Sequence, residues 1–142
     1  MNDITRFIQE NDHFARMVGI EVIEAEPGRA VARLELTQNH INPMGTAHGA
    51  ALFALAAVAF GAAANAYGTK VFGVETRISF FKPSLEGVLT ATATEISRGR
   101  KLVVYGVEIH NQANELIASF QGTAYRTAAP LDFGDSGDSE GR

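Results

Sequence analysis

An uninterrupted apolar run at residues 50–66 constrains the fold of this chain more than any other stretch. Apart from Gly61 and Asn65, the run consists of Ala, Leu, Val and Phe, and it contains no proline. Ala and Leu are among the strongest helix formers, so the run predicts one long helix. Because this helix would have no polar stripe, it cannot lie on the surface, and other elements must cover it on nearly every side.

The loop that precedes the run, residues 42–49, is polar and ends in His48 and Gly49. The first N–H groups of a helix lack acceptors within the helix, and the helix dipole places partial positive charge there. Such an end is suited to a carbonyl oxygen that gains negative charge during a reaction. The start of the long helix is therefore the first candidate site.

Strands are expected on both sides of this helix. Residues 30–36 and 88–96 alternate apolar and polar side chains, which is typical of a strand with one buried face. The first strands form a hairpin across the turn residues Glu26, Pro27 and Gly28. Further strands are predicted at residues 20–25, 71–81, 102–109 and 116–125. Their regular spacing, with turn signals between them, predicts an antiparallel meander.

The chain begins with a loose helical stripe at residues 4–17, which predicts one or two short helices that end at Gly19. Together, these elements predict an α+β protein in which a curved antiparallel sheet wraps around one long central helix. Residues 1–127 are expected to form a single domain. Residues 128–142 are acidic and rich in Gly and Ser, so we expect a disordered tail there.

Composition excludes several classes of function. The formal net charge of -4 argues against a general nucleic-acid binder. The chain has no cysteine, which excludes disulfides, a thiolate nucleophile and a cysteine metal site and fits a cytoplasmic protein. The N-terminal residues do not resemble a signal peptide. We do not expect residues 47–66 to span a membrane, because Ala and Gly are weakly hydrophobic and alternating strands follow.

The histidines do not predict a metal site. No two of them fall at a zinc-ligand spacing, and there is no HExxH motif. We expect His13, His40 and His110 to be surface or loop residues. The Gly-x-Ser-x-Gly motif of α/β serine hydrolases is also absent.

Four segments resemble one family when taken in order. They are the loop Asn42-x-x-Gly45-x-x-His48-Gly49, the helical Leu52-Phe53-x-Leu55-Ala56, the strand at residues 77–83 and the sequence at residues 98–101. Over about residues 13–126, the chain resembles hotdog-fold acyl-CoA thioesterases of the phenylacetate-degradation (PaaI-like) type. The resemblance implies an acyl-CoA substrate, no separate cofactor, and a homodimer or dimer of dimers whose active sites lie between protomers.

The resemblance also implies roles for individual residues. The Gly49 N–H would polarise the thioester carbonyl, while Asn42 and His48 would place the thioester or the attacking water. Phe53 is a candidate for the acyl pocket. Arg98, Gly99, Arg100 and Lys101 would meet the phosphates of coenzyme A, since Arg and Lys supply charge-assisted hydrogen bonds. The alternative for this basic segment is a solvated hairpin tip.

The chain departs from the family at position 57, where Ala57 stands in place of the usual catalytic carboxylate. Nine residues of helix rise about 13 Å, so a side chain at 57 serves the helix start of a partner copy more readily than its own. Without a general base, a loss on the order of 10²- to 10⁴-fold is expected. Either Ala57 is a point change in an active scaffold, or another base replaces the carboxylate. Glu75 is a candidate, unless it is a solvated strand residue paired with Arg77.

The sequence therefore favours an acyl-CoA thioesterase weakened at position 57. Three alternatives remain open: an acyl-CoA sensor or carrier without catalysis, a hotdog dehydratase, and a purely structural subunit. The dehydratase would need an acidic residue that faces its histidine across the interface, and the sequence has no matching pair.

Overall fold

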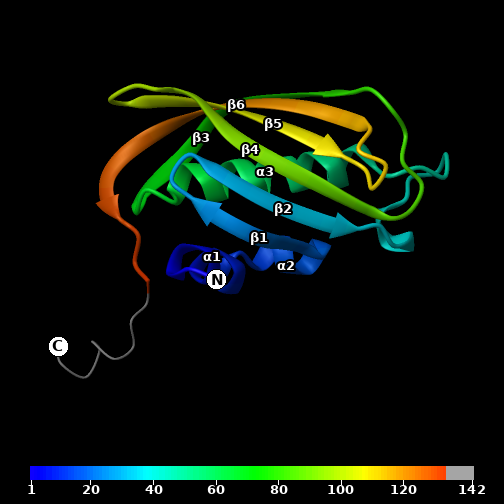
Figure 1. The fold of residues 1–142 in the computed structure, drawn as a ribbon, viewed down its shortest axis with the longest axis horizontal. Helices are drawn as coiled ribbons and strands as arrows, with labels where there is room; N and C mark the ends of the chain where they lie inside the picture. Colours follow the sequence, from blue (N-terminus) through cyan, green and yellow to red (C-terminus); the bar gives the residue numbers. More distant parts are fainter. Residues whose placement is uncertain (134–142) are drawn as a thin grey trace.

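The computed structural model of this chain describes residues 1–133. Its helices and strands are α1 (Asp3–Asn11), α2 (His13–Val18), β1 (Ile20–Glu26), β2 (Arg29–Glu35), the short 3₁₀ helix η1 (Gln38–His40), α3 (Gly49–Asn65), β3 (Thr69–Phe80), β4 (Val88–Arg98), β5 (Leu102–His110) and β6 (Leu116–Pro130). Figure 1 shows the curved sheet wrapped over α3, with α1 and α2 lying beside β1. The predicted α+β class, with one helix inside a curved sheet, is confirmed.

All six strands form one antiparallel sheet in the order β1-β2-β4-β5-β6-β3. The predicted hairpin of β1 and β2 is present. The predicted meander is correct for β4, β5 and β6 but wrong for β3, which pairs with β6 at the far edge of the sheet. Alternation shows which face of a strand is buried and does not show which strand lies beside it. The helix α3 carries the chain from β2 across the sheet before β3 begins.

The core lies between α3 and the concave face of the sheet. The alternating side chains of β2 and β4 are buried as predicted, among them Leu34 and Leu89 at 0% exposure. Small residues dominate this contact on both sides. Gly122 of β6 shows why, since a Cβ there would lie only 2.8 Å from the ring of Phe60 on α3.

The prediction that α3 is covered on nearly every side needs one correction. A stripe along the helix, made of Ala50, Phe53, Ala57 and Gly61, is exposed or half-buried. These residues follow one another at three- and four-residue steps, so they share one face of α3. An all-apolar sequence identifies a helix that must be covered but does not show whether its own chain covers every face.

The last strand continues beyond the predicted end at residue 125 and runs to Pro130. The Leu131 N–H then donates to the Gly68 carbonyl over 2.9 Å. The predicted tail therefore begins with three strand residues, while residues 134–142 lie outside the described residues. Within residues 1–133, none of the helices combines the length and apolarity needed to span a bilayer.

We predict that Gly122→Ala destabilises the fold by about 1–3 kcal/mol, the range typical of overpacking in a core. The new methyl group would meet Phe60, whose ring is packed against Tyr105 and Phe120 and cannot move away. Gly106→Ala is the matched control on the neighbouring strand, because its Cβ meets only the mobile end of the exposed Ile96. Urea unfolding of both variants tests this, and equal losses would contradict it.

Candidate active site

His48 shapes the start of α3 as its N-cap. Its Nδ1 accepts a hydrogen bond from the Ala50 N–H at 2.9 Å, and its carbonyl accepts from the N–H groups of Ala51 and Leu52. An accepting Nδ1 places the proton of the neutral ring on Nε2. The side chain is exposed and lines a cavity of about 480 Å³ beside α2. His48 thus has a structural role at the helix start, and its predicted catalytic role stays a prediction.

Gly49 is the first residue of α3, and its N–H is left without a protein acceptor within residues 1–133. It faces a cavity of about 330 Å³, which we call the Gly49 cavity; its lining includes Asn42, Gly49, Leu52, Phe80, Lys82 and Ser84. A Cβ on Gly49 would lie 3.2 Å from Cζ of Phe80, so glycine allows the ring to approach the helix start. A free N–H at the positive end of a helix dipole can donate to a developing oxyanion.

Two other polar residues of the Gly49 cavity differ in their hydrogen bonding. The Asn42 side chain is occupied within its own loop: Oδ1 accepts from the N–H groups of Met44 and Thr46, and Nδ2 donates to Thr46 Oγ1. It therefore holds the loop that leads to Gly49. Ser84 Oγ, in contrast, is the one buried side-chain nitrogen or oxygen within the described residues that has no hydrogen-bond partner.

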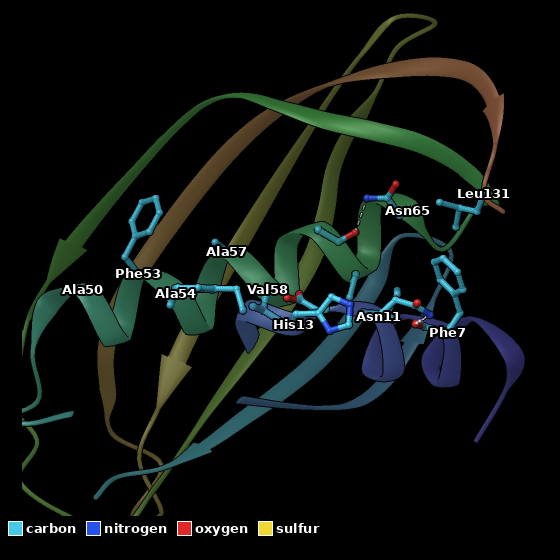
Figure 2. A pocket seen from close by; sticks show the side chains of 15 residues that line it. Phe7, Asn11, His13, Ala50, Phe53, Ala54, Ala57, Val58, Asn65 and Leu131 are labelled. Carbon is cyan, nitrogen blue, oxygen red and sulfur yellow. Dashed lines mark hydrogen bonds between the residues drawn. The ribbon is translucent and has the colours of Figure 1, made fainter. Parts of the chain in front are cut away.

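Ala57 and Phe53 lie on the exposed stripe of α3 and line a larger cavity of about 900 Å³. This cavity, the α3 groove, runs between the stripe and the residues of α1 and α2, and Leu131 lies at its edge (Figure 2). Most of its lining is apolar. Ala57 is eight residues from Gly49, a rise of about 12 Å along the helix. The structure thus separates position 57 from the Gly49 N–H of the same chain.

Glu75 lies away from these cavities. It is exposed on β3 and is not among the residues that line the Gly49 cavity or the α3 groove. Its neighbour Thr76 pairs with Gly122, which faces α3, so Glu75 points to the opposite face of the sheet. Arg77 donates to Gln121 Oε1 at 3.2 Å. Glu75 therefore lacks the placement that a base at the helix start would need in its own chain.

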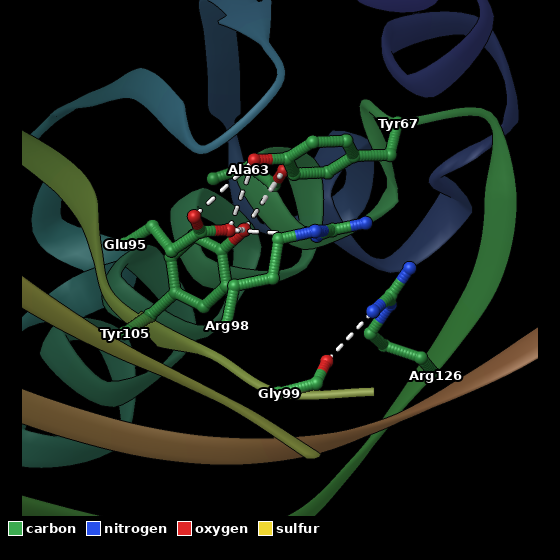
Figure 3. Close-up of polar contacts among 7 residues, drawn as sticks. All are labelled: Ala63, Tyr67, Glu95, Arg98, Gly99, Tyr105 and Arg126. Carbon is green, nitrogen blue, oxygen red and sulfur yellow. Dashed lines mark hydrogen bonds and ion pairs between the residues drawn. The ribbon is translucent and has the colours of Figure 1, made fainter. Parts of the chain in front are cut away.

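Arg98 and Gly99 lie at the opposite end of α3 from Gly49. Arg98 ends β4 instead of lying in the predicted turn, and its guanidinium stacks 3.3 Å from the ring centre of Tyr67. Glu95 accepts hydrogen bonds from the hydroxyls of Tyr67 and Tyr105, and Arg98 pairs with it (Figure 3). We call Tyr67, Glu95, Arg98 and Tyr105 the tyrosine cluster.

The other basic side chains at or near this turn differ in whether they already have a hydrogen-bond partner. Arg126 donates to the Gly99 carbonyl at 2.6 Å and holds the turn. Arg100 and Lys101 are exposed, and their side chains form no hydrogen bond or ion pair within residues 1–133. Of the predicted phosphate contacts, only these two have uncommitted charges.

The tyrosine cluster gives a pH-dependent contribution to stability. Burial, together with the hydrogen bond to Glu95, raises the pKa of Tyr105 well above its ordinary value of 10.0. The folded protein therefore keeps the phenol proton at a pH where the unfolded chain has lost it. The stabilisation from this shift is fully present below pH 10 and is lost as the pH rises further.

We predict that Tyr105→Phe lowers the free energy of unfolding by about 1–2 kcal/mol at neutral pH, because it removes a buried hydrogen bond. Above pH 10 the difference from the wild type should shrink by up to about 1.4 kcal/mol per pH unit, since phenylalanine does not ionise. Denaturant unfolding between pH 7 and 11 tests this. Tyr125→Phe, at an exposed position, is the control. A difference that stays constant with pH would contradict the prediction.

One of the histidines expected at the surface or in a loop, His40, differs from that prediction, whereas His13 is exposed as predicted. His40 is buried, at 8% exposure, and its Nε2 lies 2.6 Å from the Val18 carbonyl while Nδ1 accepts from the Thr37 N–H. It is the last residue of the short helix η1 and is not at the surface. His13 begins α2 and lines the α3 groove. The sequence showed neither the burial of His40 nor the position of His13 in the α3 groove, because both depend on how the N-terminal helices pack.

A curved antiparallel sheet wrapped around one long apolar helix is the architecture of the hotdog class. The chain belongs to the thioesterase superfamily, whose family model matches residues 44–118. It is a PaaI-like hotdog protein, as the sequence indicated.

Several relatives support this assignment. The chain is 36% identical to the acyl-coenzyme A thioesterase PaaI of Escherichia coli K12, over 86% of this chain and 88% of the relative. The solved E. coli PaaI structure superposes with a TM-score of 0.81, at 31% identity, and covers 91% and 99% of the two chains. A mutant of the phenylacetic acid degradation protein PaaI from Thermus thermophilus gives a TM-score of 0.77 at 34% identity, covering 80% and 98%.

Proposed function

We propose that this chain hydrolyses acyl-CoA thioesters to a free acid and coenzyme A, in a catalytic site built between two copies. The free N–H of Gly49, a residue that lines a cavity at the positive end of α3, carries the proposal. It is the group that a thioester carbonyl needs when its oxygen gains negative charge. The E. coli relative, itself named an acyl-coenzyme A thioesterase, supports the substrate class.

A second copy is needed because the two halves of the site lie apart in one chain. The Gly49 N–H and position 57 are separated by about 12 Å of helix. In a two-fold dimer, the α3 groove of one copy faces the Gly49 cavity of the other, and the reverse holds for the second site. The dimer thereby forms two equivalent sites.

The β3 edge of the sheet supports this arrangement. One side of β3 pairs with β6, and its other side is the edge of the sheet. It is twelve residues long and exposes Phe72 and Val74 at 58% and 60%. Long apolar edges are usually covered in native proteins. Pairing of β3 with β3 of a second copy would cover this edge and bring the exposed stripes of α3 together.

In the proposed reaction, water adds to the thioester carbonyl carbon and loses a proton to a base. The carbonyl oxygen becomes an oxyanion that accepts from the Gly49 N–H. The oxyanion then collapses, the C–S bond breaks, and the coenzyme A thiolate takes up the proton. The donor contributes a factor of about 10²–10³ by analogy with other oxyanion sites, and it does not depend on position 57.

Binding without hydrolysis is the second candidate function, and Ala57 is the observation that favours it. An alanine cannot accept a proton, while the Gly49 N–H and the apolar groove would still bind an acyl-CoA. Such a protein would sense or carry the thioester. Tight binding of acyl-CoA without release of free thiol would distinguish this function from catalysis.

We predict that Ala57→Asp raises the rate of acyl-CoA hydrolysis, by up to about 10²- to 10⁴-fold where no other side chain of the chain supplies the base. Release of coenzyme A, followed with a thiol reagent over a panel of acyl-CoAs, measures the gain. Ala50→Asp is the matched control, because Ala50 lies on the same exposed stripe and lines the same groove. It should give no gain.

Two results would contradict this prediction. An Ala57→Asp variant that folds, binds acyl-CoA and remains no faster than the wild type would exclude the missing carboxylate as the cause of low activity. A chain that sediments as a monomer while it hydrolyses substrate would exclude the two-copy site.

We also propose that Arg100 and Lys101 contact the coenzyme A phosphates, because their charges are exposed and uncommitted. The double variant Arg100→Ala/Lys101→Ala should raise KM for acyl-CoA by about three- to tenfold, since it removes charge-assisted hydrogen bonds, and should leave kcat within about twofold. A short thioester that lacks the nucleotide is the control substrate, and its kinetics should not change. An unchanged KM for acyl-CoA would show that the segment is a solvated hairpin tip.

A further inference from the structure

The absent carboxylate at position 57 raises the question of which side chain in the α3 groove could accept a proton. Four polar residues line the groove: Asn11, Asp12, His13 and Asn65. The side chains of three of them already form hydrogen bonds to the backbone. Asn65 holds β3 through Val71 and bonds the Gly61 carbonyl, Asn11 donates to the Phe7 carbonyl, and Asp12 caps α2 through the Ala15 N–H.

His13 is the exception. It is the first residue of α2 and is exposed, and its imidazole forms no hydrogen bond or ion pair within the part of the chain that the structure describes. It lines the same groove as Ala57, and Figure 2 shows both among the residues around this cavity. The groove therefore holds one uncommitted imidazole, whose ring nitrogen can accept a proton.

We propose that His13 is the general base of this chain and takes the part of the carboxylate that position 57 lacks. The inference rests on the proposed thioesterase function. Because His13 and Ala57 line one groove of one copy, the histidine serves the same composite site that a carboxylate at 57 would serve. That site contains the Gly49 N–H of the second copy.

The proposed hydrolysis needs no reactant other than water and the thioester. The neutral imidazole of His13 takes a proton from water as the water oxygen forms a bond to the thioester carbon. The resulting oxyanion accepts from the Gly49 N–H, re-forms the C=O bond and expels the sulfur. The imidazolium returns its proton to the coenzyme A thiolate, so the products are a carboxylic acid and free coenzyme A.

The surroundings of His13 suit this role. The α3 face of the groove consists of Ala, Val, Phe and Gly apart from Asn65, so it brings no charge to the imidazole. Among residues 1–133, Asp12 is the only carboxylate that lines the groove, and its Oδ1 accepts from the Ala15 N–H. On the same helix, Arg16 points back to the carbonyls of Gln9 and Glu10. A protonated imidazole cannot act as a base, so the proposed role implies a catalytic rate that falls in acid.

His13→Gln tests the inference in the full-length protein. We expect kcat for acyl-CoA hydrolysis to fall by about 10²- to 10⁴-fold, the usual value of a general base, while KM stays within about twofold. The acid limb of the kcat–pH profile should disappear. His110→Gln is the matched control: His110 lies on β5 near Glu108, outside the groove, and its loss should change neither quantity.

A double variant separates a base from a structural residue. In the Ala57→Asp background a carboxylate supplies the base, so adding His13→Gln should lower kcat less than about threefold. A structural role of His13 would lower kcat by the same factor in both backgrounds, because independent effects multiply. His13→Asn provides a second substitution if the glutamine variant folds poorly, as judged by thermal unfolding.

The outcomes distinguish this inference from the proposed function. If the wild type and the His13→Gln variant hydrolyse acyl-CoA equally fast, the role of His13 is overturned and the thioesterase function remains. A wild type without activity, whose Ala57→Asp variant is active, would overturn the role of His13 and favour binding without hydrolysis as the function of this chain. If neither protein releases thiol from any acyl-CoA, the proposed function itself fails.

Discussion

The close contact between α3 and the concave face of the sheet is the interaction on which the rest of the structure depends. A sheet can wrap a helix this tightly only where one partner at each contact is small. Gly73 and Gly122 accept the ring of Phe60, and Ala56 and Ala59 on α3 are completely buried. The burial of these apolar groups drives the enclosure, and the small residues set its radius. The curved sheet therefore follows from the composition of the helix it encloses.

Enclosing the helix also determines what happens at its start. The N-terminal N–H groups of a helix need acceptors, and a buried helix cannot take all of them from bulk water. His48 satisfies one with its side chain, and its own N–H donates to the His40 carbonyl at 2.7 Å. The buried His40 ring in turn links the end of α2, at Val18, to Thr37 in the loop. This network positions the helix start and leaves the Gly49 N–H as the free donor beside a cavity.

The sequence predicted the elements better than their arrangement, and the reason is physical. Alternation within β2 and β4 reports burial of one face, which is a local property of each strand, so these strands could be read directly. The position of β3 beside β6 and the packing of α1 on β1 depend on contacts between distant segments. The buried Thr5 illustrates this, since its hydroxyl meets the backbone of Ala25 twenty residues away. The sequence did place Gly49 at the start of the long helix and position 57 further along it, because spacing along one helix is also local, while their catalytic roles stay predictions.

The separation of donor and base along α3 explains how such a scaffold can tolerate Ala57. A general base contributes about 10²- to 10⁴-fold, and an oxyanion donor contributes a similar factor of about 10²–10³. In free energy these are each a few kcal/mol, so neither group dominates the barrier. The donor is a backbone N–H fixed by the fold, and no substitution of a side chain at 57 removes it. In the proposed mechanism, the base is a side chain in the α3 groove, which several neighbouring positions line. Of the two contributions, the base is therefore the one that can pass from one position to another while the fold and the oxyanion donor remain unchanged.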